Sequence, residues 1–175
     1  WGHYLGKGPF LEIEEDFAAQ IAKRTGGRVN INITYSGGLG KGNEVLTLAG
    51  RGAIDMASAA PGYYAQQLHF WKAFQIPFVF KTPKQAMNVL AKSLAEFPVY
   101  KQEMDKMNVN WLFQQPLGIY FLTGPSSDCE TVAGLKGKKL RSFGGDVPKA
   151  HAAIGAVPVS ISPVKVYEAL QRGTI

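Results

Sequence analysis

LKGKKLRSFGGDVPKAHAAIGAVPVSISPVKVYEALQRGTI, residues 135–175, contains the pattern that determines the fold. A short strand is predicted at 138–142, and a Gly-Gly turn and a helix at 147–154 follow it. A second strand at 157–161 and a second helix at 163–172 complete the stretch. Strands that alternate with helices in this way indicate an α/β fold.

Arg141 is the main candidate for a binding residue. Alternation along strand 138–142 places Lys139 and Arg141 on one face and Leu140 on the other. Arg141 comes at the end of the strand, beside the backbone amides of Phe143 and Gly144 and the start of the next helix. A guanidinium there can hold a small carboxylate through two parallel hydrogen bonds. A structural salt bridge to a neighbouring acid is the alternative that the pattern leaves open.

The first part of the chain shows the same alternation of helix and strand. Apolar residues at spacings of three and four predict a helix over 9–25 with one buried face: Phe10, Ile13, Phe17 and Ile21. The acids of this helix are expected on its solvent face: Glu12, Glu14, Glu15 and Asp16. Gly26 and Gly27 end the helix. Strands are predicted at 29–35 and 53–59, with a loop at 36–42 and a short helix at 43–50 between them.

Two more helices and two more strands are expected in the middle of the chain. Helical spacing runs from Met87 to Phe97, and Pro98 is expected at the first position of the following helix. Strands are predicted at 109–115 and 118–123. Residues 124–137 form a polar loop with a short helix.

Aromatic and amide side chains supply further candidates for ligand binding. Tyr63 and Tyr64 follow strand 53–59, and Trp1 and His3 precede the first helix. Tyr hydroxyls and Trp N–H groups suit a site that is partly apolar and partly hydrogen-bonding. Gln115 ends strand 109–115, where its amide can orient a ligand oxygen. Packing in the core or on the surface is the alternative for each aromatic ring.

Several functional classes are disfavoured by the sequence. The GGLGKG loop fits neither phosphate-binding pattern, the three histidines are scattered, and one cysteine excludes an internal disulfide. We therefore expect no catalytic residues, no metal, no cofactor and no enzyme activity. The net charge of +6 is spread along the chain, so no nucleic-acid partner is expected. No apolar run is long enough to span a membrane.

Three stretches together resemble one known family. They are similar to the solute-binding proteins of tripartite ATP-independent periplasmic (TRAP) transporters, the DctP-like group. The three stretches are WGHYLGKG at the start, KRTGGRVNINITYSGGLGKGNEVLTLAGRGAIDMASAAPGYYAQQ at 23–67, and residues 135–175. FQIPFVF at 74–80 adds to this likeness. The resemblance covers nearly the whole chain in one collinear order.

The resemblance implies a two-lobed α/β architecture of the periplasmic-binding-protein type, type II-like. It implies that Arg141 pairs with a substrate carboxylate and that Tyr63 or Tyr64 forms an aromatic wall. Residues near Trp1 and His3 would also contribute, and Ser162 falls where the family often lines the far side of the pocket. Gln115 is carried over on weaker grounds.

The resemblance also implies how the chain divides and what it does. Residues 1–116 would form most of lobe one and 117–175 the beginning of lobe two, with the rest of lobe two and the hinge helix absent, so a fragment is expected. The implied function is an extracytoplasmic receptor in the periplasm, its signal peptide removed or outside the chain. It would deliver a small organic acid to the membrane subunits of a transporter. The effector-binding domain of a transcriptional regulator is the alternative, and an enzyme on the same fold is a third. The sequence does not specify the acid.

Overall fold

The structure, a computed structural model, describes residues 1–118, 120–124 and 127–175. The chain divides into two compact units, Trp1–Ala59 and Ala60–Ile175. This division differs from the lobe boundary predicted after residue 116, which stays a prediction.

The first unit is built on one long helix. A 3-10 helix at Pro9–Leu11 leads into α1 (Glu12–Arg24), and α2 (Val45–Gly50) follows later. Acids in the first turn and Lys23 and Arg24 in the last turn complement the helix dipole. Gly26 and Gly27 have positive φ angles of 59° and 78°, so they end the helix as predicted.

The apolar face predicted for this helix is partly wrong. Phe10 is 45% exposed and Ile13 is 60% exposed, whereas Leu11 and Glu14 are buried. The α-helix begins at Glu12, and Pro9–Leu11 before it form a 3-10 helix, in which residues are spaced differently around the axis. Glu14 was expected in solvent with its neighbouring acids. It is instead a buried carboxylate.

Three extended segments pair beside this helix. The amide of Gly2 donates to the carbonyl of Met56 at 2.9 Å, and that of Ser58 donates to the carbonyl of Gly2 at 2.9 Å. On the other side, the amide of Thr34 donates to the carbonyl of Trp1 at 2.8 Å. The predicted strands at 29–35 and 53–59 are therefore wrong as full strands, because they form only single parallel bridges with Gly2.

The second unit begins with turns and two helices. Two 3-10 helices, Pro61–Tyr64 and Trp71–Gln75, precede α3 (Pro83–Glu96) and α4 (Val99–Lys106). The carboxylate of Glu103 accepts the amide of Phe70 at 3.0 Å, which ties α4 to the second 3-10 helix. The core of this region consists of Tyr64, Leu68, Trp71, Leu90 and Met104. Pro98 is the residue before α4 rather than its first residue.

The strands predicted at 109–115 and 118–123 are wrong within the described residues. Residues 109–118 and 120–123 form no strand, and residue 119 lies outside the described part. Trp111, Phe113, Tyr120 and Phe121 are all exposed to some degree, from 38% to 79%. Alternating apolar residues form a stable strand only where a neighbouring strand pairs with them.

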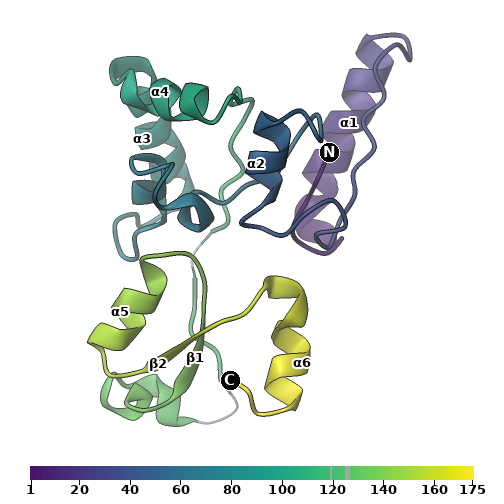
Figure 1. Ribbon diagram of the computed structural model, residues 1–175. Coiled ribbons are helices and arrows are strands. Elements are labelled where there is room, and N and C mark those ends of the chain that lie inside the picture. The colour runs from purple at the N-terminus through teal and green to yellow at the C-terminus, as the bar shows by residue number, and fades with distance from the viewer. Residues whose placement is uncertain (119, 125–126) are drawn as a thin grey trace. The chain divides into compact units, whose positions relative to one another are not determined.

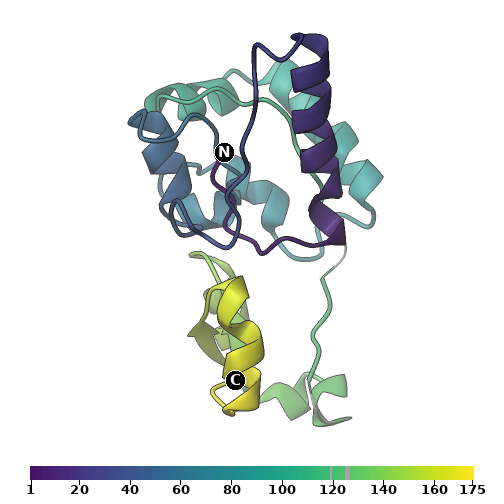
Figure 2. The ribbon, with the colours of Figure 1, turned by 90° about the vertical axis from the view of Figure 1, so that its right-hand side faces the viewer.

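The remaining part of the second unit is a strand–helix–strand unit. β1 (Lys139–Ser142) and β2 (Val157–Ser160) pair in parallel, with Arg141 opposite Val159, and α5 (Val147–Ala153) connects them. The predicted order of strand, helix and strand is confirmed. The helix predicted at 163–172 is a 3-10 helix at Pro163–Lys165 followed by α6 (Val166–Gln171). Figures 1 and 2 show α5 and α6 on opposite sides of the two strands.

Gly144, just after β1, is held at a position that only glycine fits. Its φ angle is +66°, and a Cβ atom there would lie 2.5 Å from the carbonyl oxygen of Gly62. Gly137 has a similar φ angle of +74°, but a Cβ atom at that position would meet nothing within 4 Å. A side chain would therefore strain the backbone at both positions, but it would meet a close contact only at Gly144.

We expect Gly144→Ala to destabilise the protein more than Gly137→Ala. Backbone strain alone costs about 1 kcal/mol, and the contact with Gly62 adds to it only at position 144. Urea unfolding of both variants measures the difference. Equal free energies of unfolding would show that the approach of Gly62 to Gly144 does not constrain the protein.

Candidate anion-binding site

Arg141 lies at the carboxyl end of β1, and two hydrogen bonds orient its guanidinium. Its Nε–H donates to the carbonyl oxygen of Ile161 at 3.0 Å, directly after β2. One Nη2–H donates to the hydroxyl of Tyr63 at 3.4 Å. The parallel pairing of β1 and β2 brings Arg141 and Ile161 to the same edge, which is where α/β sheets commonly bind ligands.

Neither of these two hydrogen bonds involves Nη1 of the guanidinium. A guanidinium has five N–H donors, and the bonds to Ile161 and Tyr63 use one on Nε and one on Nη2. Among the described residues, no ion pair joins Arg141 to an acid, so the structural salt bridge left open by the sequence is not seen there. A carboxylate that approaches the Nη1–Nη2 edge can still accept two parallel hydrogen bonds.

Aromatic rings surround the guanidinium. Its central carbon lies 4.8 Å from the centroid of the Phe143 ring, within the range of a cation–π interaction. The Phe143 ring in turn lies 5.7 Å from Tyr63 and 6.3 Å from Tyr120. Desolvation raises the pKa of Tyr120, against the opposing effect of the Arg141 charge, so the hydroxyl stays neutral at ordinary pH. Tyr120 was not identified from the sequence, because nothing in its local pattern indicates proximity to Arg141.

Backbone contacts fix the loop that carries Tyr63 against the loop after β1. The amide of Gly62 donates to the side-chain carbonyl of Gln75, and the Gly62 carbonyl lies against Gly144. Gly144 therefore has a structural role in this approach. Gln75 was not identified from the sequence, since the contact joins residues 13 apart through a turn that local patterns do not specify.

The start of α5 is occupied by a carboxylate of the protein itself. Asp146 precedes the helix, and its Oδ2 lies 2.9 Å from Nζ of Lys72, while Oδ1 lies 3.2 Å from Nζ of Lys149. Hydrogen bonds from Lys72, and then from Lys149, lower the pKa of Asp146. The Asp146 side chain makes no hydrogen bond to the start of α5, and its two oxygens face the two lysines instead.

Three other residues of the second unit were expected at the site: Tyr64, Gln115 and Ser162. Tyr64 is 2% exposed and belongs to the core, so Tyr63 is the tyrosine presented to Arg141. Gln115 is half-buried in a segment without regular secondary structure. Ser162 is exposed and directly follows Ile161, whose carbonyl holds Arg141. Their roles as ligand contacts stay predictions.

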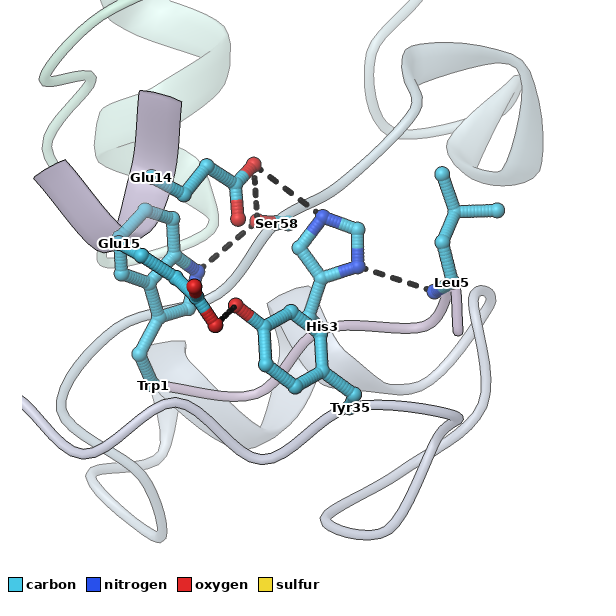
Figure 3. A network of polar contacts seen from close by, with 7 residues as sticks. All are labelled: Trp1, His3, Leu5, Glu14, Glu15, Tyr35 and Ser58. Atoms are coloured by element: carbon cyan, nitrogen blue, oxygen red, sulfur yellow. Dashed lines mark hydrogen bonds and ion pairs between the residues drawn. The ribbon is translucent and has the colours of Figure 1, made fainter. Parts of the chain in front are cut away.

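Trp1 and His3 belong to a buried polar network in the first unit (Figure 3). The amide of Leu5 donates to Nδ1 of His3 at 2.9 Å, so Nδ1 carries no proton and Nε2 donates to the carboxylate of Glu14 at 3.2 Å. The indole N–H of Trp1 donates to the hydroxyl of Ser58 at 2.9 Å, and that hydroxyl lies 3.5 Å from the same Glu14 oxygen. His3 is 2% exposed and Glu14 is 4% exposed.

A second acid of α1 extends this network toward the surface. The hydroxyl of Tyr35 donates to Glu15 at 3.0 Å, and Nζ of Lys7 lies 2.7 Å from the same oxygen. Hydrogen bonds from Lys7 and Tyr35 lower the pKa of Glu15. Desolvation, together with the Glu15 carboxylate, raises the pKa of Tyr35 to about 12. Trp1 and His3 thus have defined structural partners, whereas their role as ligand contacts is untested.

The described part of the chain holds neither a metal-binding cluster nor a membrane-spanning helix. Residues 1–118, 120–124 and 127–175 contain no group of three or more metal-ligating side chains. Within the same residues, no helix has both the length and the apolar character needed to cross a bilayer.

Comparison with known proteins identifies the class. Residues 7–175 match the family model described as bacterial extracellular solute-binding protein, family 7 (DctP). The chain belongs to this family.

Individual relatives agree with the family match. The chain is 24% identical, over 92% of its length, to a solute-binding protein of Verminephrobacter eiseniae, of which it covers 48%. It resembles a TRAP periplasmic solute-binding protein of Chromohalobacter salexigens with bound D-glucuronate, with a TM-score of 0.80 and 21% identity over 99% of the chain and 58% of that protein. It also resembles a Bordetella pertussis extracytoplasmic solute receptor that binds pyroglutamic acid, with a TM-score of 0.78 and 19% identity over 100% and 58% of the two chains.

These likenesses confirm the predicted fold class, a two-lobed α/β solute-binding protein. The chain spans about half the length of most of the curated relatives it matches, and 32% of one from Sinorhizobium fredii.

The buried network in the first unit predicts a difference between two glutamates of the same helix turn. Glu14→Ala leaves the N–H of His3 buried without its partner, and we expect it to cost about 2–3 kcal/mol of stability. Glu12→Ala, at an exposed position of the same turn, should change stability by less than about 1 kcal/mol. Thermal or urea unfolding measures both, and equal costs would show that the network around Glu14 does not stabilise the unit.

Proposed function

We propose that this protein is an extracytoplasmic solute receptor of a TRAP transporter. It binds a small organic acid through Arg141 and delivers the acid to the membrane subunits of the transporter from the periplasm. The observation that carries this proposal is the guanidinium of Arg141, which two hydrogen bonds orient at a sheet edge and which no acid of the described residues neutralises.

The comparisons support an organic acid as the ligand. The similar structures from Chromohalobacter salexigens and Bordetella pertussis bind D-glucuronate and pyroglutamic acid, and each of these ligands carries one carboxyl group. One guanidinium edge suits one carboxylate. The rings of Tyr63, Phe143 and Tyr120 supply apolar surface beside it for the rest of the molecule.

The same evidence favours a receptor over the alternatives. The family is defined by extracellular solute binding, and nothing in the match supports the effector domain of a transcriptional regulator. The residues around Arg141 bind and orient an anion, and we propose no chemical step for them. Specificity would then depend on which acid fits beside the aromatic rings.

Replacing Arg141 tests the proposal directly. A lysine keeps the charge but loses the planar fork, so we expect Arg141→Lys to weaken acid binding about 10- to 100-fold. A thermal-shift screen of monocarboxylates, dicarboxylates, sugar acids and aromatic acids identifies the acid that the protein binds, and isothermal titration then gives the affinities.

Lys139→Gln is the matched control, because it removes a positive charge from the same strand two residues away. It should leave the affinity within about twofold, since Lys139 is exposed. Unchanged affinity in Arg141→Lys would overturn the assignment of the carboxylate to Arg141.

A further inference from the structure

We propose that Lys72 and Asp146 are positioning residues of the Arg141 site. Their ion pair joins the turn that supports Tyr63 to the loop that follows Arg141, and it strengthens acid binding without touching the acid. This inference rests on the proposed function and adds to it a pair of residues that control how long the acid stays bound.

The pair connects two segments that are distant in the sequence. Nζ of Lys72 lies 2.9 Å from Oδ2 of Asp146, and the Lys72 side chain is 20% exposed. Lys72 follows Trp71, which is 2% exposed and whose indole N–H donates to the carbonyl of Tyr100 at 2.9 Å. Asp146 lies five residues after Arg141. The side chain of Lys72 therefore reaches from a well-packed turn to the loop that follows β1.

The 3-10 helix Trp71–Gln75 contacts both loops of the site. Near its end, Gln75 accepts the amide of Gly62, the residue before Tyr63. Near its start, Lys72 holds Asp146. This short helix thus sets the separation between the Tyr63 loop and the Arg141 loop, and that separation decides whether the Tyr63 hydroxyl reaches the guanidinium.

The two loops also touch directly. The Gly62 carbonyl packs against Gly144, and the rings of Tyr63 and Phe143 lie 5.7 Å apart. Glycine at position 144 permits the approach, but a glycine supplies no attraction of its own. The ion pair between Lys72 and Asp146 adds an attraction between the same two parts of the chain. It favours the arrangement in which Nη2 of Arg141 lies 3.4 Å from the hydroxyl oxygen of Tyr63.

The predicted boundary between the lobes falls between these segments, after residue 116. On that division Lys72 belongs to lobe one and Asp146 to lobe two, so the ion pair would link the lobes and stabilise their closed arrangement. An interaction present only in the closed state slows ligand release more than it changes ligand entry. For a partly exposed pair we expect an effect of about two- to fivefold.

Lys149 provides an internal control. It pairs with the same carboxylate at 3.2 Å, but from the first turns of the helix that Asp146 precedes, and its side chain is 78% exposed. Loss of Lys149 therefore removes a cation from Asp146 without separating the two loops. Loss of Lys72 removes a cation and the connection together.

The test compares Lys72→Met and Lys149→Met with the wild type in the full protein. Stopped-flow tryptophan fluorescence measures association and dissociation of the acid that binds most tightly in the thermal-shift screen. We expect Lys72→Met to release the acid about two- to fivefold faster with little change in the association rate, and Lys149→Met to behave as the wild type. Raising the salt concentration should narrow the difference between the wild type and Lys72→Met, because salt screens the ion pair.

Exchange of the two charges separates positioning from a general loss of stability. Lys72→Asp combined with Asp146→Lys should recover part of the slow release that Lys72→Met loses. Equal dissociation rates in Lys72→Met, Lys149→Met and the wild type would overturn this inference while leaving the receptor function intact. A wild type that binds no organic acid would overturn the proposed function as well.

Discussion

The hydrogen bond from Nε of Arg141 to the carbonyl of Ile161 is the constraint on which the site depends. It exists because β1 and β2 run parallel and end together, so the residue at the end of one strand reaches the residue just after the other. A free arginine side chain samples many rotamers, and fixing one of them in advance lowers the entropic cost of binding. The strand–helix–strand unit therefore does more than support the chain. It fixes the direction in which one edge of the Arg141 guanidinium points.

The surroundings of this guanidinium combine close backbone approach with aromatic surface. Gly62 and Gly144 allow two loops to meet, and the meeting places Tyr63 and Phe143 beside Arg141. A cation held over a ring and hydrogen-bonded to a neutral hydroxyl keeps its full charge for a ligand. In the proposed receptor, this combination would suit the carboxylate of an organic acid. The first unit contributes a different kind of order, a neutral histidine that donates to a buried carboxylate, which fixes the start of α1 to the extended segments beside it.

Local patterns in the sequence predicted the helices and the last two strands well, because amphipathic spacing and glycine turns specify these elements within a few residues. Arg141 was identified for the same reason, since its place at the end of a strand follows from alternation alone. The pattern failed where the structure depends on distant partners. Residues 29–35, 53–59 and 109–115 have the composition of strands, but a strand forms only where another segment pairs with it along several residues. Phe10 and Ile13 were misplaced because Leu11 and the carboxylate of Glu14 are buried at this end of α1 instead, and Glu14 is held there by a distant partner, His3.

The missed residues of the site share one property. Tyr120, Gln75, Lys72 and Asp146 each contact a partner from another segment, and no spacing along the chain records such a contact. Glu14 was missed because an acid beside three other acids resembles a solvent-exposed turn, and its partner His3 lies 11 residues earlier.

Arg141 presents its outer edge to a carboxylate in the proposed receptor, and a crystal structure of the protein with its bound acid tests that claim most directly. We predict a carboxylate within hydrogen-bonding distance of Nη1 and Nη2 of Arg141, with Nε still bonded to the carbonyl of Ile161. An acid whose carboxylate is held by other residues, with Arg141 making no contact to it, would contradict the claim.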